Sequence, residues 1–249
     1  MSYYRQGPFR PGGPGIKFGA PSLTPYIRGI MIACGVVWLL QVLLWGTAQF
    51  SLAGYLGLVP GLVIRGWLWQ PVTYMFLHSP QDLFHILFNM LLLWMFGGEL
   101  ERHWGSRAFL RYYLVCGVGG GVFATVMGYL PGGSPTIPTI GASGAIFGLL
   151  MAYGLIFSER TVLFVLIFPM KARTMAIIMF VITFFYTFSQ PSGGVSHIAH
   201  LGGAVVGFLY LKRAWRIGAL YRELQWRRHR RKFTVMPPND RDDFDRWVH

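Results

Sequence analysis

A serine at the edge of a long apolar run is the residue of this sequence with the clearest capacity for chemistry. Ser143 follows Gly141 and Ala142, precedes Gly144, and lies in a stretch without charge between Arg111 and Glu159. Residues 131–138 are rich in proline and glycine, so a helix is predicted to begin within a few residues of Ser143. The unpaired N–H groups of a first helical turn stabilise an anion beside the hydroxyl. This pattern is typical of a serine nucleophile in acyl transfer.

The same residues also have a purely structural interpretation. Gly141, Ser143, Gly144 and Gly148 are small, and small residues let helices pack closely in a membrane. The choice between the two interpretations depends on which other polar residues share the location of Ser143.

Composition indicates a membrane protein with mostly helical structure. Hydrophobic residues make up 53% of the 249 residues and charged residues only 12%, with a mean hydropathy of +0.45. These values do not suit a soluble globule. Six charge-free runs are candidates for membrane-spanning helices, and they cover residues 29–64, 83–98, 112–130, 140–158, 174–190 and 195–211. The second run is short, so we expect it to use its flanks or a locally thinner bilayer. Residues 161–170 are too few to cross and predict an interfacial or re-entrant piece.

The distribution of basic residues predicts the orientation. With six spans, Arg65 is the one residue among the 22 Lys and Arg that falls in a segment predicted to face outward. The positive-inside rule therefore places both termini in the cytoplasm. The basic cluster at 227–232 lies just inside the membrane and is typical of an anchor to anionic lipid, so we predict no nucleic-acid partner. We expect an integral multi-pass protein of the bacterial plasma (inner) membrane.

Polar residues recur near the start of every second run. His85 and Asn89 belong to the second run, Ser143 to the fourth, and His197 and His200 to the sixth. These three runs cross in the same direction, so the polar side chains share one leaflet and lie at similar depth. Buried histidine and asparagine are costly in a membrane unless they find partners, and their convergence predicts a functional site.

Helical spacing distinguishes the two histidines of the last run. They lie three residues apart, so their side chains point in directions about 60° apart. Gly203 and Gly207 follow His200 on the stripe that can approach another helix most closely. We therefore predict that His200, rather than His197, faces Ser143.

Three motifs resemble the signature elements of the rhomboid intramembrane serine proteases. They are Gly141-Ala142-Ser143-Gly144 with the following Ala145-Ile146-Phe147-Gly148, His85-x-x-x-Asn89, and Ala199-His200-Leu201-Gly202-Gly203 with Gly207. The resemblance extends from about Leu56 to Leu211. It implies an all-α, six-transmembrane-helix rhomboid-like bundle at residues 25–214. A disordered cytoplasmic arm (1–24) would precede this bundle, and a basic cytoplasmic tail (215–249) would follow it.

The resemblance also implies a role for each polar residue. Ser143 would be the nucleophile and His200 its base, while His85, Asn89 and the N–H of Ser143 would stabilise the oxyanion. Imidazole can accept the serine proton and return it to the leaving amine. No Asp or Glu falls inside a predicted span, and a triad would require Asp82 to descend into the site. We therefore predict a Ser-His dyad without metal or cofactor.

One position departs from the pattern of some members of the family, which have tyrosine four residues after the serine. This chain has Phe147 there. A phenylalanine can stack on His200 but cannot donate a hydrogen bond to it. Ring packing would therefore orient the imidazole.

Access to the site is predicted to involve the fifth run. Residues 174–190 contain five aromatic residues and no glycine, which favours a lateral gate, and residues 191–194 would form a cap. In the first loop, Trp67, Trp69 and Tyr74 are expected in an aromatic belt at the interface. Cys34 and Cys116 fall inside predicted spans and are expected to be free, apolar thiols.

The function predicted is an endopeptidase that cleaves the transmembrane segments of single-span proteins near the outer leaflet. One alternative is a rhomboid-like pseudoprotease or membrane-protein chaperone, although such a protein is expected to lack the serine or the histidine. Another is a metal-handling protein that uses His78, His85, His197 and His200. The predicted spans offer that alternative no carboxylate or thiolate ligands beside the histidines.

Overall fold

The computed structural model describes residues 23–131, 133–164, 167–189 and 197–212. This part of the chain is mostly helical, in agreement with the predicted class. Three stretches are long and apolar enough to cross a membrane: α1 (Pro25–Ala48), the stretch Leu83–Trp104 and α7 (Ser106–Met127). The helices α8 (Ser143–Ile156) and α9 (Ala172–Ser189) are apolar but shorter, and residues 197–212 are also helical.

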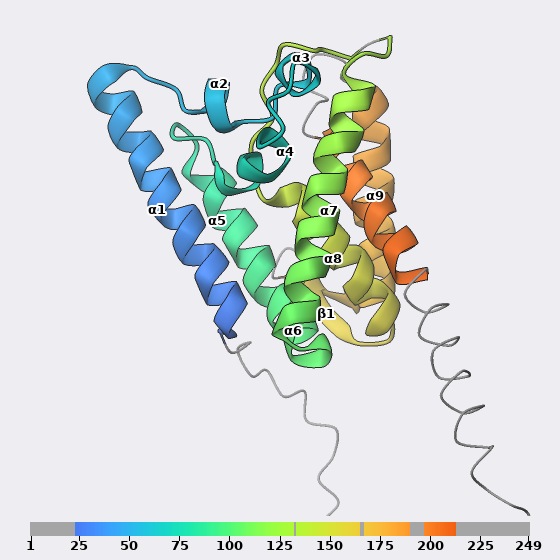
Figure 1. Ribbon diagram of the computed structural model, residues 1–249. Helices are drawn as coiled ribbons and strands as arrows, with labels where there is room; N and C mark the ends of the chain where they lie inside the picture. Colours follow the sequence, from blue (N-terminus) through green and yellow to red (C-terminus); the bar gives the residue numbers. More distant parts are fainter. Residues whose placement is uncertain (1–22, 132, 165–166, 190–196, 213–249) are drawn as a thin grey trace, which may run out of the picture.

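The ends of the bundle differ in structure. The start of α1 and the end of the helical residues 197–212 lie at the same end of the molecule (Figure 1). The opposite end carries the short helices that connect α1 to α5 (Figure 1). They are α2 (Ala53–Leu56), α3 (Pro60–Ile64), α4 (Gln70–Thr73) and the 3-10 turn η1 (Tyr74–Phe76). The predicted arm and tail, except Leu23 and Thr24, fall in parts of the chain that are not described.

The second stretch extends beyond its charge-free run, as its shortness predicted. It consists of α5 (Leu83–Leu92), the π-helical η2 (Leu93–Gly97) and α6 (Gly98–Trp104). The added length brings two acidic residues, Glu99 and Glu101, into this helical stretch, beyond the predicted span 83–98. Glu101 is 2% exposed, yet its carboxylate accepts hydrogen bonds from Thr24 Oγ1 (2.5 Å), Ile27 N (3.1 Å) and Ser106 Oγ (2.7 Å). These donors offset the cost of burying the charge.

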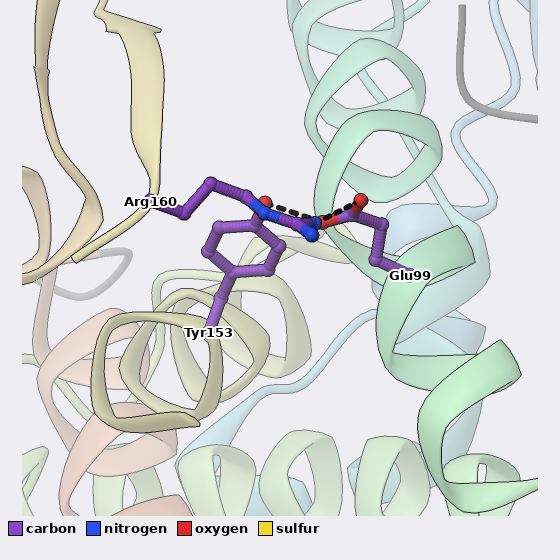
Figure 2. A network of polar contacts seen from close by, with 3 residues as sticks. All are labelled: Glu99, Tyr153 and Arg160. Atoms are coloured by element: carbon purple, nitrogen blue, oxygen red, sulfur yellow. Dashed lines mark hydrogen bonds and ion pairs between the residues drawn. The ribbon is translucent and has the colours of Figure 1, made fainter. Parts of the chain in front are cut away.

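The segment predicted to be an interfacial or re-entrant piece contains a β-hairpin. The strands β1 (Thr161–Phe164) and β2 (Phe168–Lys171) pair antiparallel, with Thr161 opposite Lys171. Glu99 of α6 anchors the start of the hairpin, because it accepts hydrogen bonds from Tyr153 of α8 and from Arg160 (Figure 2). The hairpin can pair its backbone groups within itself, which a single extended segment in this position could not do.

Glycines let the central helices approach closely, as predicted. A Cβ on Gly203 would overlap the backbone of Gly144, and a Cβ on Gly207 would lie 3.1 Å from the Cα of Gly148. The helix 197–212 is therefore in backbone contact with α8. Cys34 and Cys116 are buried free thiols, in agreement with the expectation from the sequence.

The aromatic residues of the first loop divide into two groups. Trp67 and Trp69 stack on each other with centroids 5.2 Å apart, and Trp69 is exposed. Tyr74 is instead buried, and its hydroxyl donates a hydrogen bond to the carbonyl oxygen of Gly117 (2.7 Å). The expectation that Tyr74 belongs to an exposed belt is wrong, because the 3-10 turn η1 directs this side chain toward α7.

Candidate active site

The site begins at the first residue of α8. This helix starts at Ser143, where the proline- and glycine-rich segment predicted a start. Gly141 has φ +125°, a conformation that residues with a Cβ rarely adopt, and its N–H donates a hydrogen bond to the carbonyl oxygen of Tyr74 (2.9 Å). The turn before α8 is therefore fixed to η1, and the Ser143 N–H belongs to an unpaired first turn.

His200 contacts the serine directly. Its Nε2 lies 2.5 Å from Ser143 Oγ, within hydrogen-bond distance. The backbone contact between Gly144 and Gly203 makes this distance possible, because it brings the two helices together one turn from the pair. In the tautomer whose Nε2 is unprotonated, the hydroxyl donates to the imidazole, which is the arrangement that general-base catalysis requires.

Phe147 fixes the plane of the imidazole. Its ring stacks on that of His200 with centroids 4.5 Å apart and an interplanar angle of 6°. Because phenylalanine offers no hydrogen bond, ring packing restrains the rotation of His200 on this side.

His197 faces another part of the molecule. Its ring lies against Tyr186 of α9, with centroids 5.3 Å apart, and makes an edge contact with His200 at 5.7 Å. The contact with Ser143 belongs to His200, so the helix is rotated as its glycines predicted. Residues 191–194, the predicted cap, are not among the described residues.

His85 points a hydrogen-bond donor toward the serine. Its Nδ1 accepts a hydrogen bond from the N–H of Ser79 (3.2 Å), so the proton of the neutral ring resides on Nε2. A Cβ built on Gly141 would lie 2.8 Å from this Nε2 and 3.5 Å from Ser143 Oγ. The donor and the hydroxyl therefore border the same small space beside Gly141, where an oxyanion could form.

Asn89 lies one helical turn after His85. Its Nδ2 donates a hydrogen bond to the carbonyl oxygen of His85 (2.7 Å), which leaves a second hydrogen on this amide. The side chain is buried, and its Oδ1 has no protein partner. The amide is therefore held on α5 by one bond, with further hydrogen-bonding capacity remaining.

Asp82 is engaged away from His200. It precedes α5, where its carboxylate accepts a hydrogen bond from the N–H of Phe84 (3.0 Å), as a helix cap does. Ser143 and His200 therefore contact each other, and the carboxylate of Asp82 does not take part in that contact. Within the described ranges, no three His, Cys, Asp or Glu side chains gather in a way that could hold a metal ion.

Several contacts of this site were not predicted. Gln41 and Trp38 on α1, and the backbone of His78 and Ser79, support the segment next to His85. The sequence could have indicated the contact of Gln41, since an amide inside an apolar run needs a hydrogen-bond partner. The ring of His78 is fully buried beside that of His85, with centroids 5.1 Å apart.

The burial of His78 predicts a dependence of stability on pH. Burial, with a smaller contribution from His85, lowers the pKa of the His78 imidazole to about 4. The unfolded chain has a pKa of about 6.5 at this residue and binds the proton more readily. The contribution of His78 to folding stability is thus complete above about pH 6.5. As the pH falls from about 6.5 to about 4, roughly 3 kcal/mol is lost.

A His78→Phe variant keeps an aromatic ring but cannot bind a proton. Thermal unfolding in detergent micelles between pH 4 and pH 7 is expected to show a smaller slope for this variant than for the parent protein. Equal slopes would contradict the assignment of this pH dependence to His78.

Comparison with known proteins gives consistent matches. A model of the Rhomboid domain matches residues 65–216. The chain is 29% identical over 190 residues to the rhomboid protease GluP of Bacillus subtilis, covering 76% of this chain and 34% of that protein. It is 30% identical over 135 residues to the mitochondrial Rhomboid protein 1 of Saccharomyces cerevisiae, covering 53% and 38%. It is 28% identical over 199 residues to the rhomboid protease GlpG of Serratia proteamaculans, covering 74% of this chain and 61% of that protein. The chain spans less than two thirds of each of these relatives.

Proposed function

Because the chain belongs to the rhomboid family, we propose that it is an intramembrane serine endopeptidase that uses Ser143 and His200 as a catalytic dyad. The observation that carries this proposal is the 2.5 Å contact between His200 Nε2 and Ser143 Oγ at the start of α8. The substrates proposed are the transmembrane segments of single-span membrane proteins. A pseudoprotease has no need for this contact, and this favours the enzyme over the chaperone alternative.

The proposed reaction has two stages. In the first, Ser143 Oγ attacks the substrate carbonyl carbon while His200 Nε2 takes the hydroxyl proton. The carbonyl oxygen becomes an oxyanion that accepts hydrogen bonds from the Ser143 N–H, His85 Nε2–H and Asn89 Nδ2–H. Collapse of this intermediate breaks the peptide bond, and His200 gives its proton to the leaving amine. In the second stage, water attacks the acyl carbon while His200 takes a proton from it. The bond between this carbon and Ser143 Oγ then breaks, the new carboxyl terminus leaves, and His200 returns the proton to Ser143.

The proposed topology contains six membrane-spanning helices. They are α1, the stretch Leu83–Trp104, α7, α8, α9 and the helix that contains residues 197–212. The distribution of basic residues favours both termini in the cytoplasm, and in this orientation the site opens near the outer leaflet of what we propose is a bacterial inner membrane. Residues 25–214 form the protease domain in this proposal, between the short arm and the basic tail.

The proposed route for substrate passes beside α9. Near the hairpin, α9 packs tightly on α8, because a Cβ on Gly154 would overlap that of Ala176. Toward its other end, Phe185 and Tyr186 are exposed, and Tyr186 reaches the site through its contact with His197. An α9 that is held at one end and exposes large side chains at the other can tilt to admit a transmembrane segment.

The proposed function is tested with the full chain reconstituted in lipid vesicles. A panel of single-span substrate proteins and a fluorophosphonate, which labels activated serines, serve as the probes. Cleavage of at least one substrate and labelling of the enzyme are expected. A chain that folds but shows neither labelling nor cleavage would instead support the pseudoprotease alternative.

Asn89→Ala tests the oxyanion site. The substitution removes one donor that acts mainly in the transition state, so the rate of cleavage is expected to fall roughly 10- to 10³-fold. Covalent labelling of Ser143 by the fluorophosphonate is expected to persist, because nucleophile and base remain. An unchanged cleavage rate would assign Asn89 to helix packing alone.

A further inference from the structure

Hydrogen bonds join α1 to the loop before α5. Cys34, Trp38 and Gln41 are spaced by four and three residues, so they lie on one face of α1. Trp38 Nε1 donates a hydrogen bond to the carbonyl oxygen of Ser79 (3.0 Å), and Gln41 Oε1 accepts one from the N–H of His78 (3.0 Å). Gln41 is 4% exposed, so its amide is committed to the interior of the protein.

These two bonds lie on either side of the peptide group that joins His78 to Ser79. The N–H of His78 comes just before this group in the chain, and the carbonyl group of Ser79 comes just after it. With both ends bonded to α1, which packs alongside α5 (Figure 1), the Ser79 N–H has a fixed direction. That N–H is the group that donates to His85 Nδ1.

The direction of the Ser79 N–H decides which nitrogen of His85 carries the proton. While Nδ1 accepts from Ser79, the proton of the neutral ring remains on Nε2, which faces the space beside Ser143. If the loop rotated away, Nδ1 could hold the proton instead. Nε2 would then present a lone pair to a developing oxyanion, and this would raise the energy of the transition state.

We propose that Gln41 is a positioning residue of α1 that sets the tautomer and direction of His85 through the backbone of His78 and Ser79. This inference rests on the proposed function, since it assigns His85 as an oxyanion donor. The inference adds α1 to the elements that support the active site, although α1 precedes the region 65–216 that the family model matches. The hydrogen bond to His78 also explains how Gln41 is tolerated inside an apolar helix, because a buried amide without a partner would destabilise the fold.

The test uses a near-isosteric substitution in the full chain reconstituted in lipid. Gln41→Met keeps the length of the side chain but removes the carbonyl that accepts from His78. Because an oxyanion donor acts in the transition state, kcat is expected to fall about 10- to 100-fold while KM stays within about twofold. Gln41→Glu keeps an acceptor oxygen and is expected to restore most of kcat. Leu43→Met, at a 62% exposed position of the same helix, is the matched control and is expected to behave as the parent protein.

A double-mutant comparison separates positioning from general stability. In a His85→Ala background, Gln41→Met is expected to cause little further loss of kcat, because the residue through which Gln41 acts is already absent. A loss of similar size in both backgrounds, or an unchanged kcat in Gln41→Met, would overturn the positioning role. If Gln41→Met fails to fold, Trp38→Phe provides the same comparison, since it removes the donor to the Ser79 carbonyl.

The two proposals fail in distinguishable ways. If the parent protein neither cleaves any substrate nor reacts with the fluorophosphonate, the proposed function is wrong, and the role of Gln41 is wrong with it. If the parent protein is active but Gln41→Met does not follow the pattern above, only the inference about α1 is overturned.

Discussion

Replacing Ser143 with alanine is expected to abolish peptide hydrolysis and to leave the fold intact. The substitution removes the oxygen proposed as the nucleophile and its contact with His200 Nε2, so in the proposed mechanism no acyl-enzyme can form. Loss of a nucleophile typically lowers kcat by about 10⁴-fold or more. Cleavage of a reconstituted single-span substrate and labelling by a fluorophosphonate are the measurements, and both are expected to fall to background.

The Ser143→Ala variant should remain a folded membrane protein. Alanine is compatible with the first turn of α8, and the substitution removes only one oxygen atom. Thermal unfolding within a few degrees of the parent protein would show that the loss is chemical. Ser134→Ala, a serine of the loop before α8, is the matched control and is expected to keep full activity. Substantial hydrolysis by Ser143→Ala would exclude the proposed mechanism.

Local sequence signals account for the part of the site that could be predicted. The proline- and glycine-rich segment placed the start of α8 at Ser143, because these residues cannot continue a helix. The glycines after His200 predicted both the face of the last helix and its close approach to α8. The stacking of Phe147 on His200 was implied by the resemblance, because some family members have tyrosine at this position, one helical turn after the serine. Each of these features depends on residues a few positions apart.

Features that depend on distant segments were not predictable in this way. Glu101 lies beyond the charge-free run 83–98, yet it is buried inside a helix, where Thr24, Ile27 and Ser106 supply donors. The hairpin at 161–171 depends on pairing between two short strands that the apolar pattern did not indicate. Gln41 finds its partner at His78, and no sequence periodicity links the two. Each required knowledge of which segments are neighbours in space.

The two histidines of the last helix provide the sharpest test of how the site is assembled. Three residues correspond to about 300° of rotation, so the two rings cannot both point at Ser143. His200 contacts Ser143 and stacks on Phe147, whereas His197 lies against Tyr186 of α9. The base proposed for catalysis is therefore His200, and His197 belongs to the side from which substrate is proposed to enter.

His200→Ala is expected to eliminate both cleavage and labelling, because Ser143 then has no group to take its proton, and the rate should fall by about 10⁴-fold or more. His197→Ala is expected to keep substantial labelling and to lose at most a modest part of the rate. The two variants remove the same ring from the same helix, so each is a control for the packing consequences of the other. If instead His197→Ala were inactive and His200→Ala active, the last helix would be rotated relative to this arrangement, and the role of base would pass to His197.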